Sequence, residues 1–274
     1  MHVTKVRAVF FSPTGTTRKI VTTIADAIAS QMTVEWEQLD FTLPEARESA
    51  PVFAAGELVV VGAPVYAGRV PNVLLKYMAT LQGDGTLAVP VVLFGNRNYD
   101  DALIELRDIL QKDGFHTIAA AAFVGEHAFS YTLAGGRPDA ADIALATAFA
   151  GRVAAKLRAL GGHTPAPVDV KGVPYPYRGY FQPRDANGNA IDMRKVKPRV
   201  NDDCTDCKLC VAACPMGSIS YDDVTEYTGI CIKCGACIKV CPEHARYYDH
   251  PQYLYHKQEL EESLTRRAEP ELFL

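Results

Sequence analysis

Apolar and polar positions alternate in blocks along the first 160 residues. Several blocks are continuous apolar runs, typical of parallel strands that are covered on both faces. The predicted strands are 6–11, 33–39, 57–64, 89–95 and 116–124. Between them, apolar residues such as Ile20, Ile24 and Ile28 recur at helical spacing. Further helices are predicted at 71–81, 99–112 and 138–160. This alternation predicts an α/β domain with a doubly wound, five-stranded parallel sheet.

The pattern changes after residue 160. Residues 163–200 are rich in proline and glycine, but they also carry aromatic residues, which a flexible linker would lack. We therefore expect this connector to pack on a surface. The last stretch begins as a short amphipathic helix and ends with Leu272, Phe273 and Leu274; it could fold back on the first domain or engage a partner. The predicted division is 1–162, 163–200, 201–250 and 251–274.

Composition and charge narrow the class of protein. The chain is 48% hydrophobic and 22% charged, as in ordinary globular proteins. It has no apolar run of about 18 residues, so no transmembrane segment is expected. Its N-terminus lacks the features of a signal peptide, which favours the cytoplasm. Residues 166–200 hold seven Lys/Arg against three Asp/Glu, and residues 201–250 hold four against eight. This charge pattern fits two interpretations: the basic and acidic surfaces are each solvated, or the basic connector lies across the acidic unit. Neither resembles a nucleic-acid-binding surface.

All eight cysteines fall in two runs that share the spacing C-x2-C-x2-C-x3-C-P. They are Cys204, Cys207, Cys210, Cys214, Cys231, Cys234, Cys237 and Cys241. In a cytosolic chain, cysteines point to metal or redox chemistry before disulfides. Three closely spaced thiolates can hold three corners of an iron–sulfur cubane. Zinc, which prefers paired C-x2-C units with a longer spacer, and a disulfide framework are the weaker alternatives.

These runs closely resemble the bacterial two-cluster ferredoxin module, over about residues 201–250. The resemblance implies two 4Fe-4S clusters that carry electrons singly. It also implies that the fourth cysteine of each run binds the other cluster. One cluster would take Cys204, Cys207, Cys210 and Cys241, and the other Cys231, Cys234, Cys237 and Cys214. We also expect Ile219 and Tyr221 to pack beside the clusters.

A second candidate site lies at the carboxyl ends of the predicted strands, where doubly wound sheets bind ligands. The loop after the first strand offers hydroxyls and amides at a helix N-terminus, which suits a phosphate dianion. Its candidate residues are Ser12, Thr14, Gly15, Thr16 and Thr17. The loop matches neither the Walker motif nor G-x-G-x-x-G. Since Ser12 stands where a thiol nucleophile would, a phosphatase is disfavoured. An ordinary capped turn is the alternative.

Two further loops follow the third and fourth strands. Their candidate residues are Pro64, Val65, Tyr66 and Gly68 in one, and Gly95, Asn96, Arg97, Asn98, Tyr99 and Asp101 in the other. The first loop resembles the S/T-x-T-G-x-T loop of flavodoxins, which binds the phosphate of FMN, and the likeness covers about residues 3–160. The resemblance implies that the other two loops surround the isoalloxazine ring. Tyr99 is then the stacking candidate and Tyr66 lies near the opposite face, although surface packing is the plainer interpretation of each tyrosine.

More narrowly, "GNRNYDDAL" (95–103) and "GEHAFSYTLAGGRPD" (125–139) resemble the flavodoxin-like half of bacterial flavodoxin–ferredoxin fusion proteins. Arg97 could place positive charge near flavin N1 and O2 and so stabilise the anionic reduced flavin. His127 could donate a proton to reduced flavin, or it could be a loop residue bonded to a carbonyl. Arg137 carries the same ambiguity.

Together these features predict an electron-transfer protein that passes electrons between FMN and two 4Fe-4S clusters, with redox proteins as donor and acceptor. No catalytic residue is predicted. The main alternative is an FMN-dependent reductase of a small organic substrate, fed with electrons through the clusters. A redox or oxygen sensor is the third hypothesis. Direct reduction by NAD(P)H is not supported, because no second phosphate-binding glycine motif is present.

Overall fold

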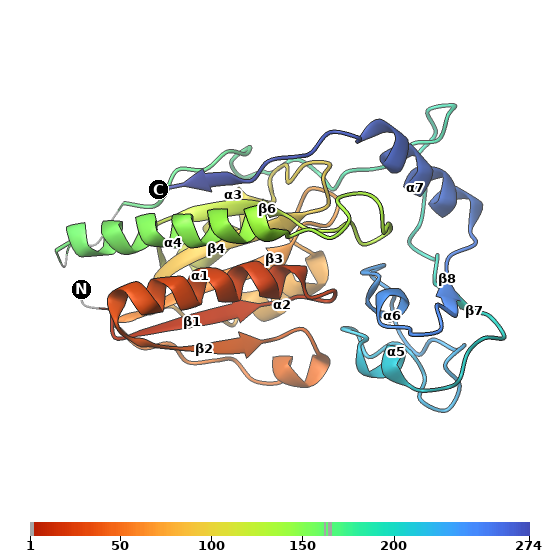
Figure 1. Cartoon of the computed structure of the whole chain (residues 1–274), viewed down its shortest axis with the longest axis horizontal. Coiled ribbons are helices and arrows are strands. Elements are labelled where there is room, and N and C mark those ends of the chain that lie inside the picture. The colour runs from red at the N-terminus through yellow and green to blue at the C-terminus, as the bar shows by residue number, and fades with distance from the viewer. Residues whose placement is uncertain (1–2, 162, 164–165) are drawn as a thin grey trace.

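A computed structural model describes residues 3–161, 163 and 166–274. Over these residues, the first domain is built on a seven-stranded sheet with helices on both faces (Figure 1). The strands are β1 (Lys5–Phe10), β2 (Glu35–Asp40), β3 (Glu57–Pro64), β4 (Leu87–Phe94), β5 (His116–Thr117), β6 (Ala120–Val124) and β9 (Glu271–Phe273). The helices are α1 (Thr16–Met32), α2 (Leu75–Met78), α3 (Ala102–Lys112) and α4 (Ala140–Ala159).

The strand order is β2-β1-β3-β4-β6-β9, with β5 also pairing with β4. Every pairing among β1 to β6 is parallel, whereas β9 is antiparallel to β6. Without β9 and the short β5, this order is the 2-1-3-4-5 order of flavodoxin-like sheets. The predicted doubly wound parallel sheet is thus confirmed, and β9 is an addition that the sequence did not reveal.

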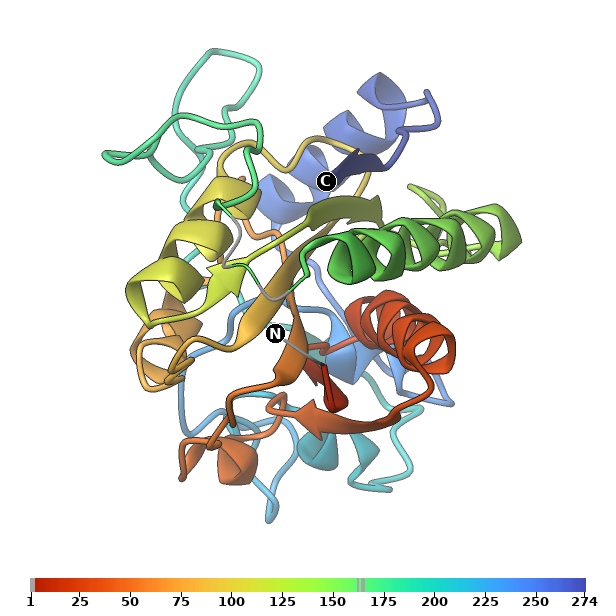
Figure 2. The same ribbon diagram turned by 90° about the vertical axis from the view of Figure 1, so that its left-hand side faces the viewer.

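Burial explains why the central strands are apolar throughout. Helices α1 and α4 cover one face of the sheet, and α2 and α3 cover the other (Figure 2). Strand β4 is therefore buried at every position. The approach of α1 to β3 is close, because a Cβ at Gly62 would lie 2.3 Å from Val21 Cγ2.

Two predicted elements differ from the structure. The strand expected at 116–124 is divided into β5 and β6, since Ile118 and Ala119 interrupt the ladder. The helix expected at 71–81 is reduced to a 3-10 turn, Asn72–Leu74, followed by the single turn of α2. The predicted boundary at residue 162 lies outside the described residues.

The connector packs on the first domain, as its aromatic content predicted. Asp101 accepts hydrogen bonds from the amides of Val173 (2.9 Å) and Arg178 (2.8 Å). The Arg69 guanidinium lies 4.7 Å from the ring centre of Tyr177 and 5.2 Å from that of Tyr180. These contacts fix the connector across the ends of β3 and β4.

The chain then forms the cysteine-rich unit, beyond the carboxyl ends of the strands (Figure 1). Its elements are β7 (Arg199–Val200), α5 (Leu209–Ala212), α6 (Ala236–Lys239) and β8 (Arg246–Tyr247). Helix α7 (Pro251–Ser263) follows, and the tail returns to the sheet as β9. The tail therefore folds back on the first domain, a point that the sequence left open. None of the helices in the described part of the chain has the length and apolarity needed to cross a bilayer.

Candidate flavin and cluster sites

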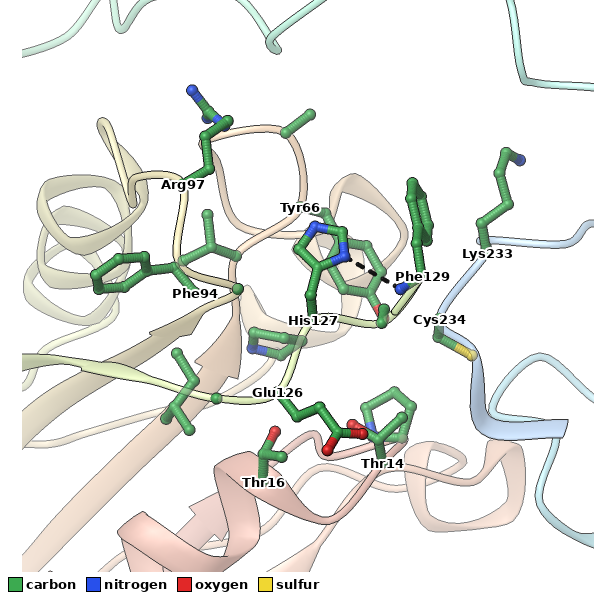
Figure 3. A pocket seen from close by; sticks show the side chains of 18 of the residues that line it. Thr14, Thr16, Tyr66, Phe94, Arg97, Glu126, His127, Phe129, Lys233 and Cys234 are labelled. Atoms are coloured by element: carbon green, nitrogen blue, oxygen red, sulfur yellow. Dashed lines mark hydrogen bonds between the residues drawn. The ribbon is translucent and has the colours of Figure 1, made fainter. Parts of the chain in front are cut away.

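A cavity of about 260 Å³ lies between the carboxyl ends of the strands and the cysteine-rich unit (Figure 3). We call it the interdomain cavity. Its walls come from the loops after β1, β3, β4 and β6, from the connector, from the second cysteine run and from α7. Of the predicted site residues it is lined by Thr14, Thr16, Thr17, Pro64, Val65, Tyr66, Gly95 and Arg97.

The loop after β1 forms one end of this cavity. Gly15 adopts φ 82° at the start of α1, a left-handed conformation that favours glycine. The Oγ of Ser12 accepts the amide of Arg18 at 2.9 Å, so Ser12 braces the turn. Thr14, Thr16 and Thr17 face the cavity. The first amides of α1 have no acceptor within the helix, and its first turn carries no acidic side chain. This end of the cavity fits an anion.

Aromatic side chains form the middle of the cavity. Tyr66 and Phe129 lie close to the His127 ring in Figure 3, and the His127 and Phe129 rings meet edge to face at 5.1 Å. Burial raises the pKa of Tyr66 well above its usual value, and the nearby thiols of Cys234 and Cys231 add to the shift. A flat apolar wall with polar edges suits a conjugated ring system.

His127 is held as a neutral ring. Its Nδ1 accepts the amide of Phe129 at 3.1 Å, which places the ring proton on Nε2. Burial lowers the pKa of His127 to about 4, and positive charge at Lys239 and Arg97 contributes. The loop partner is therefore an amide and not the carbonyl considered from the sequence. At neutral pH the ring is not a cationic acid.

Tyr99 does not line the interdomain cavity, so its expected stacking role is corrected. It is 4% exposed, lies in the core 5.6 Å from the Phe94 ring, and its hydroxyl donates to Glu271 at 3.0 Å. Tyr99 lies three residues before the start of α3, and its hydroxyl reaches Glu271 in the tail strand β9.

Three other candidates hold the chain together instead of lining this cavity. Asn96 donates to the carbonyls of Leu264 (2.9 Å) and Arg266 (2.8 Å) and accepts the amide of Ala268 (3.0 Å), so it binds the tail. Asp101 anchors the connector. Arg137 is buried, pairs with Asp142, and donates to the Ala268 carbonyl.

Gly68 and Asn98 shape the loops behind the cavity. A Cβ at Gly68 would overlap the Asp100 carboxylate, and Asn98 Oδ1 accepts the Asp100 amide at 2.9 Å. Arg97 lines the cavity, but Asp100 pairs with its guanidinium, which also lies 4.3 Å from the Phe181 ring centre. The charge that Arg97 brings to the cavity is thus partly balanced.

Sequence reasoning missed the lining residues that come from distant segments. These residues are Phe129, Phe181, Pro183, Met193, Ile232, Lys233, Cys234, His256 and Leu260. The available signals were the aromatic content of the connector, which includes Phe181, and the stretch 125–139, which includes Phe129.

Two smaller cavities lie within the cysteine-rich unit. Cluster site A is lined by Cys204, Cys207, Cys210 and Cys241. Cluster site B is lined by Cys231, Cys234, Cys237 and Cys214. Each therefore brings together three cysteines of one run and the fourth of the other, which is the grouping that the ferredoxin resemblance implied. In the described part of the chain, no group of three or more His, Cys, Asp or Glu residues is placed to hold a single metal ion.

The surroundings of cluster site B are mainly apolar. Burial raises the pKa of the Cys237 thiol to about 12, and the negative charge of Cys231 adds to the rise. A bound metal centre would reverse this, since coordinating thiols are deprotonated. Ile219 lines cluster site B as expected. Tyr221 is 68% exposed, so the expectation that it packs beside a cluster was wrong; Tyr227 and Tyr248 line cluster site B instead.

Cys234 belongs to two cavities, because it lines both cluster site B and the interdomain cavity. The contact between the two halves is close at this point: a Cβ at Gly235 would lie 2.5 Å from the Ala128 carbonyl oxygen. Lys239 Nζ donates to the carbonyls of His127 (3.0 Å) and Ser130 (3.2 Å) and pairs with Glu126.

The chain is similar to known proteins of two kinds. A family model described as a 4Fe-4S dicluster domain matches residues 203–246. No curated protein matches the chain. Among solved structures, a flavodoxin from the domain Archaea is 15% identical, with 56% of this chain and 99% of that chain covered and a TM-score of 0.41. A flavodoxin of Streptococcus pneumonia TIGR4 is 20% identical, with coverages of 56% and 99% and a TM-score of 0.39. An NADH:FMN oxidoreductase is 17% identical, with coverages of 55% and 90% and a TM-score of 0.41.

These structural likenesses are too weak to carry an argument, so the assignment of the first domain rests on its strand order. That order is the flavodoxin-like one, and the second unit matches the dicluster family. The chain therefore joins a domain with flavodoxin-like strand order to a unit that matches the 4Fe-4S dicluster family over residues 203–246.

Proposed function

We propose that this protein transfers electrons between FMN, bound in the interdomain cavity, and two 4Fe-4S clusters held at cluster sites A and B. One observation carries the proposal. Cys234, a cysteine of cluster site B, lines the same cavity as the anion-binding loop that starts α1. A cofactor anchored by that loop would therefore lie beside a cluster ligand. When bound, FMN exchanges one or two electrons and a 4Fe-4S cluster exchanges one.

The residues of the chain would bind and enclose the flavin. Thr14, Thr16 and Thr17, with the amides that begin α1, would hold the phosphate. Tyr66 and the neutral His127 would contact the ring, and Nε2 of His127 is available as a hydrogen-bond donor. The connector and α7 would add Phe181, Met193 and Leu260 to the walls around the flavin.

The route to redox partners is expected to pass through the clusters. The connector and α7 contribute Phe181, Met193 and Leu260 to the cavity wall, which covers the flavin position. At cluster site A, in contrast, Cys207 is exposed. A protein donor or acceptor would therefore exchange electrons at cluster site A.

A reductase of a small organic substrate is the second candidate. It is favoured by the imidazoles of His127 and His256, which both line the interdomain cavity and could orient a polar substrate beside the flavin. It would show substrate-dependent reoxidation of the flavin without any protein acceptor.

The proposal is tested on anaerobically purified holoprotein. We expect FMN and about eight irons per chain, four for each cluster. Reduction by a ferredoxin-type donor in a stopped-flow instrument should bleach the cluster band first and the flavin band next. Full iron content without flavin, or a flavin that never exchanges electrons with the clusters, would refute the proposal.

A further inference from the structure

The cysteine-rich unit is an internal repeat in which Cys231 follows Cys204 by 27 residues, as Cys241 follows Cys214. The two halves have the same local geometry. The amide of Ser218 lies 3.3 Å from Cys214 Sγ, and the amide of Ala245 lies 3.3 Å from Cys241 Sγ. Residues at equal places in the repeat can therefore be compared directly.

The repeat differs in charge at one pair of buried positions. Ile219 lines cluster site B and is 5% exposed. Its equivalent, 27 residues later, is Arg246, which lines cluster site A and is 3% exposed. One cluster site thus has an isoleucine where the other has a buried cation.

Arg246 is held beside cluster site A by two hydrogen bonds. Its guanidinium donates to the Tyr227 hydroxyl at 3.0 Å and to the Val224 carbonyl. An arginine guanidinium keeps its positive charge in proteins, and Arg246 lines the same cavity as Cys204, Cys207, Cys210 and Cys241. A fixed charge in this position acts on the sulfur ligands directly.

The charge of Arg246 also reaches Cys237 of cluster site B, although Arg246 lines cluster site A and not cluster site B. At cluster site A, Lys208 is paired with the exposed Asp206, and Glu243 is exposed, so water screens them. The described residues that line cluster site B include no Asp, Glu, Lys, Arg or His. Nearby, Lys233 Nζ donates to the carbonyls of Cys231 (3.0 Å) and Arg194 (3.4 Å) and not to a sulfur.

We propose that Arg246 makes the cluster at site A the easier of the two to reduce, so that a single electron rests at the site that does not line the interdomain cavity. The inference rests on the proposed function, since it needs both clusters. Reduction adds one electron to the cluster and converts one ferric iron to ferrous, with no bond broken and no proton taken up. A buried positive charge stabilises the more negative, reduced form. The asymmetry would draw electrons from site B towards the exposed Cys207.

The first test uses the wild-type holoprotein, so folding of a variant does not enter. Dithionite supplies one electron per chain, and NMR resolves the contact-shifted cysteine methylene protons, assigned by sequence. We expect the shifts of a reduced cluster at Cys204, Cys207, Cys210 and Cys241. Equal sharing of the electron, or reduced-cluster shifts at Cys231, Cys234, Cys237 and Cys214, would overturn the proposal.

The second test measures both cluster potentials by EPR-monitored titration of variants. Arg246→Gln should move the electron distribution towards site B by about tenfold, which is 59 mV for a one-electron couple. Arg246→Lys should keep most of the difference. Lys233→Gln is the matched control and should widen the gap, because it removes charge near site B.

These outcomes are distinct from those that would refute electron transfer itself. If Arg246→Gln keeps its iron and the gap is unchanged, the role of Arg246 is refuted while the proposed function stands. If the wild type lacks flavin or one cluster, the proposed function fails first. If a variant loses iron, the NMR measurement on the wild-type protein alone decides which cluster is reduced first.

Discussion

Tyr66 and Tyr99 follow the ends of neighbouring strands and look alike in the sequence, yet they lie in different environments. Tyr66 lines the interdomain cavity, whereas Tyr99 is buried and bonded to Glu271. Sequence gives the position of a residue relative to a strand end. The direction of its side chain depends on what packs against the loop, and here that partner is a strand 172 residues away.

Substitution of the two tyrosines should separate their roles. Tyr66→Ala should weaken FMN binding by about tenfold, or about 1.4 kcal/mol, through lost aromatic contact. Tyr99→Phe should leave FMN affinity unchanged and cost about 1 kcal/mol of stability through its lost hydrogen bond, which lowers the thermal midpoint by about 2–4 °C. Fluorescence titration and thermal unfolding measure these effects. A larger loss of FMN affinity in Tyr99→Phe than in Tyr66→Ala would reverse the assignment.

His127 gives a prediction about pH. Its folded pKa is about 4, against about 6.5 when unfolded. Between these values the unfolded chain binds more protons, so stability falls as the pH drops from 6.5 to 4 and is flat above 6.5. The upper bound of the effect is on the order of 3 kcal/mol.

The measurement is ¹⁵N NMR of the imidazole in the flavin-free protein. We expect a neutral ring, protonated on Nε2, from pH 8 down to pH 5. His127→Gln should remove this part of the pH dependence of unfolding, while His163→Gln, at an exposed histidine, should not. A His127 ring that is half-protonated near pH 6.5 would contradict the prediction.

The placement of the tail on the first domain depends on specific side chains, of which Asn96 is one. Asn96 makes three hydrogen bonds to the segment between α7 and β9, at a backbone φ of 67°. Asn98, two residues later, makes one local bond to the Asp100 amide. The two asparagines are a matched pair within one loop.

Asn96→Ala should therefore loosen the tail and Asn98→Ala should not. We expect Asn96→Ala to cost about 2–3 kcal/mol, since each lost hydrogen bond contributes about 1 kcal/mol. Limited proteolysis should cleave between α7 and β9 faster, and the flavin should dissociate faster because His256 and Leu260 of α7 line its cavity. Equal cleavage rates in the two variants would show that Asn96 does not hold the tail.

The elements also show where sequence reasoning ends. Strands β3 and β4 were predictable because burial on both faces requires an unbroken apolar run. The loop before α1 was predictable because its hydroxyls and glycine serve a local geometry. Phe181 and His256 were not predictable as cavity residues, because they reach it through the tertiary path of the connector and tail. Asp101 was assigned to a ligand, but it binds the connector, a partner that a pattern in one loop cannot reveal.

At the scale of the whole molecule, the internal repeat of the cysteine-rich unit is adapted to its two neighbours. Lys208 and Gly235 are equivalent positions, and both have positive φ, 61° and 76°. Lys208 lies on the outer side, beside cluster site A. Gly235 packs on the Ala128 carbonyl of the flavodoxin-like domain, where no Cβ fits. The absence of a side chain at residue 235 is thus what allows cluster site B to approach the interdomain cavity.

This contact can be opened without substituting a cysteine or any side chain expected to bind the flavin. Gly235→Lys copies the residue that the equivalent position already accepts, so its backbone strain is no more than about 1–2 kcal/mol. The new side chain must displace Ala128, which moves Cys234 away from the cavity. Because electron transfer slows steeply with distance, stopped-flow reduction should show slower exchange between clusters and flavin, with iron and FMN content preserved. Lys208→Gly, at the outer position, should leave the exchange rate unchanged. An unchanged rate in Gly235→Lys would mean that electrons do not cross at Cys234.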